Sequence, residues 1–468
     1  MRLLFIYPST GMTHVTSEVH VPLGAFLPPL GLLYLARMVE AQGHTVEVID
    51  CNAEIFDEVT LQRKIRSADA IGMTILSQPE ELEYSTAVAK KIKQIAPEIP
   101  LIIGGWHCTF SPEQALHDHH ADICVRGESE YIIGPLMEAL EGTRNLASIH
   151  GLVYQKKGKM CKNELQPPIM DLDQLPFPSR HLVEKYEYGY TFGTKTMKGK
   201  VTSLLSSRGC PCRCTFCQLS SNLTKYRRRS VLNTVKEIDE LVAEGYNSIA
   251  FVDDNFLADK KRAEQIMDHI IKQRYDITLW ILDTRVDSAD KILYEKMRDA
   301  GVKCVSFGVE SGDQDILNYY NKNITLKQVK EAIMLSKEMG FIVKANFILG
   351  APNETIKQMQ TTIKFSKSLP IDFVYFNHLE YIIGTPLWQQ AVKEGKINPD
   401  ECVVKSDRQR GLALYDEHEI ERFCKNAYYS FYLNPQFWFR EIKYALLNHD
   451  KEFVLQGLNI LLKNSPKT

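Results

Sequence analysis

Cys210-Pro-Cys-Arg-Cys214-Thr-Phe-Cys217 is the stretch that decides the fold of this chain. Without Cys212, its cysteines have the spacing Cys-x3-Cys-x2-Cys. Three thiolates in one short loop can hold three irons of a cubane cluster, and the fourth iron then has no protein ligand and is open to chemistry. A zinc knuckle or a disulfide loop is the alternative. Zinc needs a fourth ligand at finger-like spacing, and no Cys-x2-Cys or His-x3-His pair follows closely.

Short apolar strands alternate with helices from residue 201 to about 390, which predicts parallel strand–helix units. The expected strands are 201–207, 248–252, 278–281, 304–308, 342–349 and 373–377. The expected helices are 232–244, 260–273, 289–300, 326–339 and 356–368. Functional residues of β/α barrels gather at the carboxyl ends of the strands, so we expect the site at these ends.

The strand ends carry short motifs in a fixed order. They are Asp253-Asp-Asn-Phe256, Gly308-Val-Glu-Ser-Gly312, Gly350-Ala-Pro-Asn-Glu354 and, beyond the last strand, Gly384-Thr-Pro386. Together with the cysteine spacing and with Phe216 before the last cysteine, this order resembles the radical S-adenosylmethionine (SAM) enzymes. The resemblance implies a partial (β/α)6 barrel and a [4Fe-4S] cluster bound by Cys210, Cys214 and Cys217, with Cys212 as a bystander.

The same resemblance implies which residues bind SAM. Asp254 would accept a hydrogen bond from the SAM ammonium, Arg285 would pair with the SAM carboxylate, and Glu310 would contact SAM as well. The expected SAM-binding set is Phe216, Asp254, Arg285, Glu310, Ser311 and Gly350. Structural alternatives exist for several of them: Glu310 as a solvated loop acid, Gly350 as a turn residue and Arg285 in a structural ion pair.

Residues 1 to about 145 show a similar alternation, with strands expected at 3–7, 45–49, 70–74, 101–104 and 123–125. Helices are expected at 30–41, 58–66, 80–96 and 112–117. This pattern predicts a doubly wound, Rossmann-like parallel sheet, whose ligands bind at the carboxyl ends of the strands. No Gly-x-Gly-x-x-Gly follows the first strand, which argues against a nicotinamide site.

The loops at these strand ends resemble the cobalamin-binding domain that precedes many radical SAM domains. Gly104 and Gly105 allow a close backbone approach. The resemblance implies cobalamin contacts by Ser9, Thr10, Thr74, Leu76, Ser77, Gly104, Gly105, His107 and Glu128. The alternative is a generic Rossmann-like sheet that binds no cobalamin.

The chain is expected to divide into four parts: a cobalamin-binding domain (1–145), a linker (146–200), a radical SAM domain (201–390) and a helical C-terminal domain (391–468). Prolines in Asp171-Leu-Asp-Gln-Leu-Pro-Phe-Pro178 predict a stiff, extended strap within the linker. Helices are expected at 417–432 and 437–462, with aromatic side chains that mostly pack a small helical cap.

Composition narrows the class further. The net charge of −2 argues against a nucleic-acid-binding surface. Eleven cysteines, four of them in eight residues, indicate a reducing compartment, and hence a cytoplasmic protein, rather than a disulfide framework. No run approaches 18 apolar residues, so no membrane span is expected.

These resemblances place the chain beside the cobalamin-dependent (class B) radical SAM methyltransferases. They imply an anaerobic enzyme that methylates an unactivated carbon through a 5′-deoxyadenosyl radical and methylcobalamin. They also imply an external electron donor of the flavodoxin or ferredoxin type that reduces the enzyme. The substrate would be a protein side chain, as in methyl-coenzyme M reductase, or a small molecule such as a tetrapyrrole, lipid or antibiotic precursor. The alternatives are a cobalamin-dependent radical SAM cyclase or oxidoreductase acting on a tetrapyrrole-like substrate, and a non-enzymatic cobalamin or redox sensor.

We predict that cobalamin binds with no histidine on its lower face. Methyl-carrying domains that use a histidine have Asp-x-His-x-x-Gly after the first strand, and neither His14 nor His20 has this context. Electron paramagnetic resonance (EPR) of the cob(II)alamin form checks this, because an axial nitrogen splits each cobalt line into three. Unsplit lines are expected; a triplet that disappears in His14→Ala, His20→Ala or His107→Ala would contradict the prediction.

Overall fold

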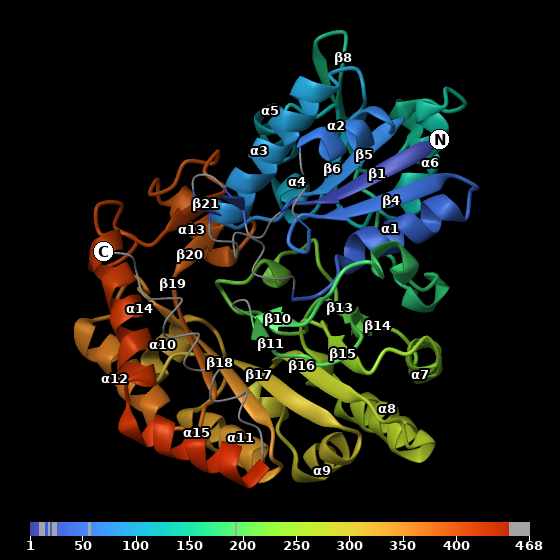
Figure 1. Ribbon diagram of the computed structural model, residues 1–468. Coiled ribbons are helices and arrows are strands. Elements are labelled where there is room, and N and C mark those ends of the chain that lie inside the picture. Colours follow the sequence, from blue (N-terminus) through green and yellow to red (C-terminus); the bar gives the residue numbers. More distant parts are fainter. Residues whose placement is uncertain (9–14, 17–18, 21–25, 55–57, 192–193, 449–468) are drawn as a thin grey trace. The chain divides into compact units, whose positions relative to one another are not determined.

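The computed structural model describes residues 1–8, 15–16, 19–20, 26–54, 58–191 and 194–448 (Figure 1). The chain forms two compact units. The first comprises Met1–Met197 with Pro399–Val403, and the second comprises Lys198–Asn398 with Val404–Thr468. Within the described ranges, no helix has the length and apolar character that crossing a membrane requires.

A seven-stranded sheet forms the centre of the first unit. Its order is β4 (Thr45–Asp50), β1 (Arg2–Tyr7), β5 (Ala70–Thr74), β6 (Leu101–Gly104), β7 (Ile123–Val125), β8 (Leu152–Lys156) and β9 (Lys159–Lys162). The first five strands are parallel, and β8 and β9 add to the edge in antiparallel pairs. The parallel strands are almost wholly buried, because helices cover both faces of such a sheet.

The helices of this unit are α1 (Leu30–Glu40), α2 (Glu58–Arg66), α3 (Pro79–Ile95), α4 (Trp106–Phe110), α5 (Pro112–Asp118) and α6 (Glu130–Leu140). The five predicted strands and four predicted helices are confirmed within one residue at each end. Helices α4 and α6 were not predicted. Helix α6 contains Gly134 and Pro135, which disfavour a helix interior, yet its buried apolar face holds it in place.

The strand order determines where the first unit can bind a ligand. Among the parallel strands the chain order is 2-1-3-4-5, and the direction of winding changes between β1 and β5. In open sheets of this kind, ligands bind at the carboxyl ends of the strands beside that switch point. The carboxyl ends of β1 and β5 therefore lie at the edge where cobalamin is expected from the sequence.

The region 146–197 packs with the first unit. Strands β8 and β9 form a hairpin and extend the sheet. The Tyr188 hydroxyl donates a hydrogen bond to Asp50 Oδ2 at 3.1 Å, and the backbone N–H of Ser179 donates to Leu33 O at 3.1 Å. Burial raises the pKa of the Asp50 carboxyl to about 6, while hydrogen bonds from Asn52 and Tyr188 oppose that rise.

The second unit contains a six-stranded parallel sheet in which the strands follow chain order. They are β12 (Val201–Leu204), β15 (Ser248–Phe251), β16 (Thr278–Thr284), β17 (Val302–Glu310), β18 (Ile342–Leu349) and β19 (Phe373–His378). The intervening helices are α7 (Val231–Ala243), α8 (Lys260–Gln273), α9 (Lys291–Asp299), α11 (Leu326–Glu338) and α12 (Ile356–Lys367). The described sheet begins at β12 and ends at β19, which is the open (β/α)6 arrangement that was predicted (Figure 1).

Side chains alternate across this sheet with the period of two that strands impose. Val305, Phe307 and Val309 of β17 belong to the large apolar core that they share with the helices. Cys304, Ser306 and Gly308 alternate with these residues along the strand and therefore lie on the other face. Helices α11 and α12 begin with capping boxes at Thr325 and Thr355, directly before the predicted starts at 326 and 356.

The remaining described elements are short or C-terminal. The helices are α10 (Gln314–Tyr319), α13 (Pro386–Lys393), α14 (Glu417–Tyr432) and α15 (Pro435–Asn448). The paired short strands are β2 (Val15–Thr16) with β3 (Val19–His20), β10 (Tyr190–Thr191) with β11 (Thr194–Lys195), β13 (Ser207–Arg208) with β14 (Arg227–Arg228) and β20 (Glu380–Ile382) with β21 (Val403–Lys405). The helix predicted at 417–432 is confirmed; the one predicted at 437–462 begins at Pro435 and is described as far as Asn448.

Candidate functional site

The cysteine loop is fixed at its start by two neighbouring acids at the end of β15. Asp253 is buried and accepts hydrogen bonds from the backbone N–H of Ser206 at 3.0 Å and from its hydroxyl at 2.7 Å. Asp254 Oδ2 accepts a hydrogen bond from the Gly209 N–H at 3.0 Å. Gly209 has a φ of +75°, and a Cβ there would lie 2.6 Å from Lys225 O, so only glycine fits. The sequence analysis did not assign this holding role to Asp253.

The segment after helix α10 fixes the far side of the loop. The Thr215 N–H donates to Tyr320 O at 3.0 Å, and Asn321 Nδ2 donates to Arg213 O at 2.7 Å. The Phe216 ring packs edge-on against Tyr320, with ring centroids 5.1 Å apart. The loop is thus anchored by protein contacts alone, at its start by the two acids after β15 and at its far side by the segment after α10.

The thiols of this loop affect one another's pKa values. Cys210 is hydrogen-bonded to Cys212, and this bond, followed by burial, raises the pKa of the Cys210 thiol. The charge of Cys217 acts on Cys210 and that of Cys214 acts on Cys217, so the three predicted ligands are electrostatic neighbours. In the ranges that the structure describes, no three His, Cys, Asp or Glu side chains converge on a site for a single ion. Cluster binding by Cys210, Cys214 and Cys217 remains a prediction.

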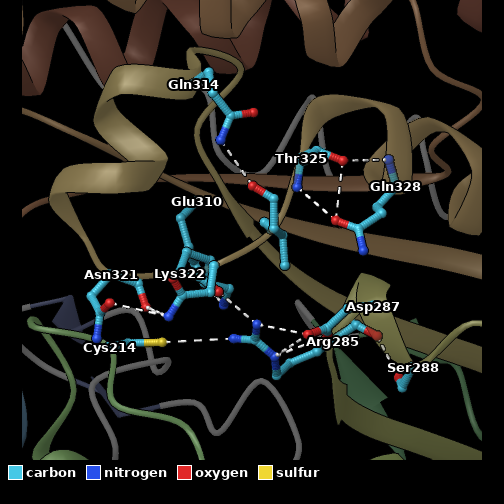
Figure 2. A network of polar contacts seen from close by, with 12 residues as sticks. Cys214, Arg285, Asp287, Ser288, Glu310, Gln314, Asn321, Lys322, Thr325 and Gln328 are labelled. Atoms are coloured by element: carbon cyan, nitrogen blue, oxygen red, sulfur yellow. Dashed lines mark hydrogen bonds and ion pairs between the residues drawn. The ribbon is translucent and has the colours of Figure 1, made fainter.

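Arg285 lies beside the thiol of Cys214 (Figure 2). Its Nη1 donates to Cys214 Sγ at 3.8 Å, and its Nε and Nη2 grip the carboxylate of Asp287 at 3.0 Å each. Nη2 also donates to Lys322 O at 2.6 Å. Burial raises the pKa of the Cys214 thiol, and the positive charges of Lys322 and Arg285 oppose that rise. The structural ion pair considered for Arg285 is therefore present; contact with SAM remains a prediction.

Glu310 forms a buried ion pair with Lys322, whose Nζ lies 2.7 Å from Glu310 Oε1 (Figure 2). Glu310 has a φ of +71°, a value that is rare outside glycine. The residue lies at a register shift between β17 and β18. A Cβ on Gly308 would lie 2.4 Å from Glu310 Oε1 and 2.9 Å from Lys322 Nζ. The first glycine of the motif thus makes room for the ion pair. Lys322 was not among the predicted residues.

The rest of that motif ties β17 to helix α12. Ser311 is fully buried, and its hydroxyl lies 3.1 Å from Thr362 Oγ1. The Gly312 N–H donates to the same Thr362 oxygen at 3.0 Å, and a Cβ on Gly312 would lie 2.8 Å from Thr362 Cα. These contacts give Ser311 a structural role. Its predicted contact with SAM remains a prediction.

The turn after β18 is held by its own acid. Glu354 Oε2 accepts hydrogen bonds from the N–H groups of Gly350 at 2.7 Å and Ala351 at 3.2 Å. Burial raises the pKa of the Glu354 carboxyl to about 7. Gly350 has a φ of +95°, and Ser406 Oγ would lie 2.7 Å from a Cβ there. The turn therefore requires glycine at 350 regardless of any ligand.

Asp283 is a further acid of this region that the sequence analysis missed. Solvent reaches the side chains of Asp254 and Asp283, yet burial is the largest cause that raises their pKa values, to about 6 and about 7. Protein atoms around the two carboxyls displace part of their hydration, although both side chains are exposed to solvent. The negative charges of Asp254 and Glu310 also raise the pKa of Asp283. Perturbed carboxyls gathered in this way are typical of functional sites.

In the first unit, the predicted cobalamin residues that are described lie at the ends of β5 and β6 and in the segments that follow β5, β6 and β7, with His107 in helix α4. Gly105 has a φ of +110°, and a Cβ there would lie 2.5 Å from Ile75 O, so this glycine serves the packing of two loops against each other. A Cβ on Gly104 would meet ordinary contacts at 3.7 Å or more. Thr74 and Leu76 are half-buried, and Ser77 is buried.

Two other predicted residues take part in internal contacts, and several cannot be placed. His107 is buried, its ring centroid lies 6.1 Å from that of His119, and burial lowers the pKa of its imidazole to about 4. Glu128 Oε2 accepts a hydrogen bond from the Ile169 N–H at 2.6 Å. Outside the described residues or side chains lie Ser9, Thr10, His14 and the side chain of His20. Cobalamin contact by all these residues remains a prediction.

Comparison with known families agrees with this architecture. Residues 204–366 match the radical SAM superfamily, and residues 19–136 match the B12 binding domain. The first match includes the cysteine loop and strands β15 to β18, and the second includes most of the predicted cobalamin domain. The two matches confirm the predicted cofactors: an iron–sulfur cluster with SAM, and cobalamin.

Relatives extend the likeness along the chain. An uncharacterized methyltransferase of Pyrococcus horikoshii is 33% identical over 94% of this chain and 95% of its own length. The anaerobic magnesium-protoporphyrin IX monomethyl ester cyclase of Rubrivivax gelatinosus is 30% identical over 78% of this chain and 66% of its own length. The chain belongs to the cobalamin-dependent radical SAM methyltransferase family, and it is an enzyme of that methylating class.

Solved structures share the fold. The radical SAM methyltransferase TsrM of Kitasatospora setae, with tryptophan and a SAM analogue bound, gives a TM-score of 0.67 at 18% identity and covers 84% of this chain and 76% of that chain. The cobalamin-dependent SAM radical enzyme OxsB, with aqua-cobalamin and SAM bound, gives 0.68 at 18% identity and covers 99% of this chain and 75% of that chain.

We predict that Cys210, Cys214 and Cys217 bind the cluster and that Cys212 does not. Replacing each cysteine with alanine, followed by anaerobic measurement of iron content and visible absorption, checks this. Loss of the cluster is expected in the first three variants, and a full cluster in Cys212→Ala. An equal loss in Cys212→Ala would sink the assignment.

We also predict that Glu310→Gln and Asp254→Asn weaken SAM binding while the cluster is retained. The loss of a charge-assisted hydrogen bond costs about 1.5–3 kcal/mol, or about 10- to 100-fold in affinity. Because Glu310 also neutralises Lys322, thermal unfolding must be measured beside SAM affinity. Glu331→Gln is the matched control, since its pair with Lys327 is exposed. Unchanged SAM affinity in both site variants would show that the pocket lies elsewhere.

Proposed function

We propose that this enzyme methylates an unactivated carbon. The observation that carries the proposal is that a B12 binding domain and a radical SAM domain occur in one chain, which aligns over 94% of its length with a methyltransferase. The cysteine loop in the second unit lies at the carboxyl ends of β12 and β15, where this reaction requires it.

When bound, the cluster and SAM supply a 5′-deoxyadenosyl radical, and methylcobalamin supplies the methyl group. In the proposed function, the chain's own residues position these reactants. Cys210, Cys214 and Cys217 hold the cluster, and Asp253 and Asp254 keep the loop in register with β15. The loops after β5 and β6 hold the cobalamin.

The buried charges of the site suit this task. Lys322 and Arg285 place two positive charges beside a cluster held by thiolates, and each cation has its own acid partner. Fixed charges in a site of restricted solvent access act more strongly than they do in water, and they need no rearrangement when the reaction occurs. A low-potential flavodoxin- or ferredoxin-type electron donor would complete the system.

The substrate is a prediction taken from the sequence. A protein side chain, as in methyl-coenzyme M reductase, and a small molecule are both compatible with the class. Relatives differ in this respect: they include a cytidylyl-2-hydroxyethylphosphonate methyltransferase of Streptomyces wedmorensis and a hopanoid C-2 methylase of Rhodopseudomonas palustris. A mass increase of one methyl group on a trapped substrate would identify it.

One observation favours a second candidate, a radical SAM cyclase. The Rubrivivax gelatinosus cyclase aligns with 78% of this chain at 30% identity. The methyltransferase relative is more similar and aligns with nearly the whole of both chains, so we favour methyl transfer.

We predict that turnover releases both S-adenosylhomocysteine and 5′-deoxyadenosine, because one SAM remethylates cobalamin and the other is cleaved. Chromatography of the nucleosides from an anaerobic reaction with the reconstituted enzyme measures the two products. Deoxyadenosine alone would indicate the cyclase, and neither product would indicate a sensor. A Cys214→Ala variant is the control, in which 5′-deoxyadenosine should be lost.

A further inference from the structure

The guanidinium of Arg285 is almost fully committed within the protein. Of its five N–H groups, Nε–H and one Nη2–H face Asp287, the other Nη2–H faces Lys322 O, and one Nη1–H faces Cys214 Sγ (Figure 2). Among its contacts with the residues that the structure describes, one N–H remains for a ligand. Most of the hydrogen-bonding capacity of Arg285 is therefore used within the protein, including one bond to the Cys214 thiol, and little is left for a bound molecule.

The backbone around Arg285 is fixed as firmly as its side chain. Arg285 directly follows β16 and caps the short 3₁₀ turn Val286–Ser288. The Ser288 hydroxyl donates a hydrogen bond to Arg285 O, which closes that turn. The fork formed with Asp287 then fixes the plane of the guanidinium, because an arginine and a carboxylate match best when both nitrogens engage. The Nη1 group is thus directed at the sulfur.

We propose that Arg285 is a positioning residue that raises the reduction potential of the iron–sulfur cluster through the Cys214 thiolate. This inference rests on the proposed function, in which Cys214 is a cluster ligand. In the step concerned, the oxidised cluster takes one electron from an external one-electron reductant, and no bond breaks and no proton moves. The added negative charge is stabilised by a hydrogen bond to sulfur and by a nearby positive charge.

The two cations of the site differ in how far their charge is compensated. Lys322 and Glu310 have side chains that are 7% and 8% exposed, so the charges of this pair largely cancel each other locally. Arg285 is 9% exposed, but its partner Asp287 is 34% exposed. Water screens Asp287 more than it screens Arg285, so the field at the sulfur keeps the sign of the arginine. Asp287 moderates this field without abolishing it.

Opposite effects of the two ion-pair partners test the proposal. Full-length variants with reconstituted clusters are titrated against a set of redox mediators, and the reduced cluster is followed by EPR. Arg285→Gln should lower the ratio of reduced to oxidised cluster at a fixed potential about tenfold, equivalent to about −59 mV for one electron. Asp287→Asn should raise the ratio, since it leaves the arginine uncompensated. Arg285→Lys keeps the charge without the fork and should fall between wild type and Arg285→Gln.

The control is Arg298→Gln, which removes an exposed arginine of helix α9 and should leave the potential unchanged. Equal potentials in wild type and Arg285→Gln, or shifts of the same sign in Arg285→Gln and Asp287→Asn, overturn the inference. Weaker SAM binding with an unchanged potential in Arg285→Gln also overturns it, and assigns Arg285 to SAM. If Arg285→Gln does not retain its cluster, Arg285→Lys and Asp287→Asn decide. A wild-type protein that holds no cluster would instead refute the proposed function.

Discussion

The site depends on one buried carboxylate, that of Asp253. A carboxylate removed from water is costly unless hydrogen bonds satisfy its oxygens. Asp253 meets this requirement with the backbone N–H of Ser206 and the hydroxyls of Ser206 and Ser207, all on the segment that leads into the cysteine loop. Burial raises the pKa of Asp253, and these hydrogen bonds oppose that rise. The acid therefore needs the loop entry in one position, and that position places the thiols at the strand ends.

Charge compensation extends from this anchor. In the proposed cluster site three thiolates would bring negative charge to the loop, and the two nearby cations each have an acid partner of their own. Breaking a buried pair by removing one member leaves an uncompensated charge and costs about 3–5 kcal/mol. The Glu310–Lys322 pair requires glycine at position 308 and is accompanied by a positive φ at Glu310. Strain of this kind is typical of functional sites, where surrounding structure maintains it.

The fold could be predicted from the sequence almost completely, whereas the site could be predicted only in outline. Apolar runs and helix caps mark strands and helices locally, and parallel strands bring their carboxyl ends to one edge, so Asp254, Arg285 and Glu310 were placed in one region. Partners distant in sequence leave no such mark. Thr362 binds Ser311 from 51 residues away, and Lys322 lies in a loop without a motif. Helix α6 escaped prediction because tertiary burial outweighs the local effect of Gly134 and Pro135.

The in-order sheet has a consequence for how the protein matures. The cysteine loop follows the first strand of the second unit, but the contacts that complete its surroundings come later in the chain. Tyr320 and Asn321 hold its far side, and the Leu387 N–H donates to Thr215 O at 3.0 Å. At a synthesis rate of about 5–20 residues per second, the thiols leave the ribosome roughly ten seconds or more before Leu387 does. During that interval the nascent chain carries four neighbouring cysteines that lack their later contacts. We therefore expect the cluster to be inserted after the sheet has formed. Until then the thiols need protection from oxidation.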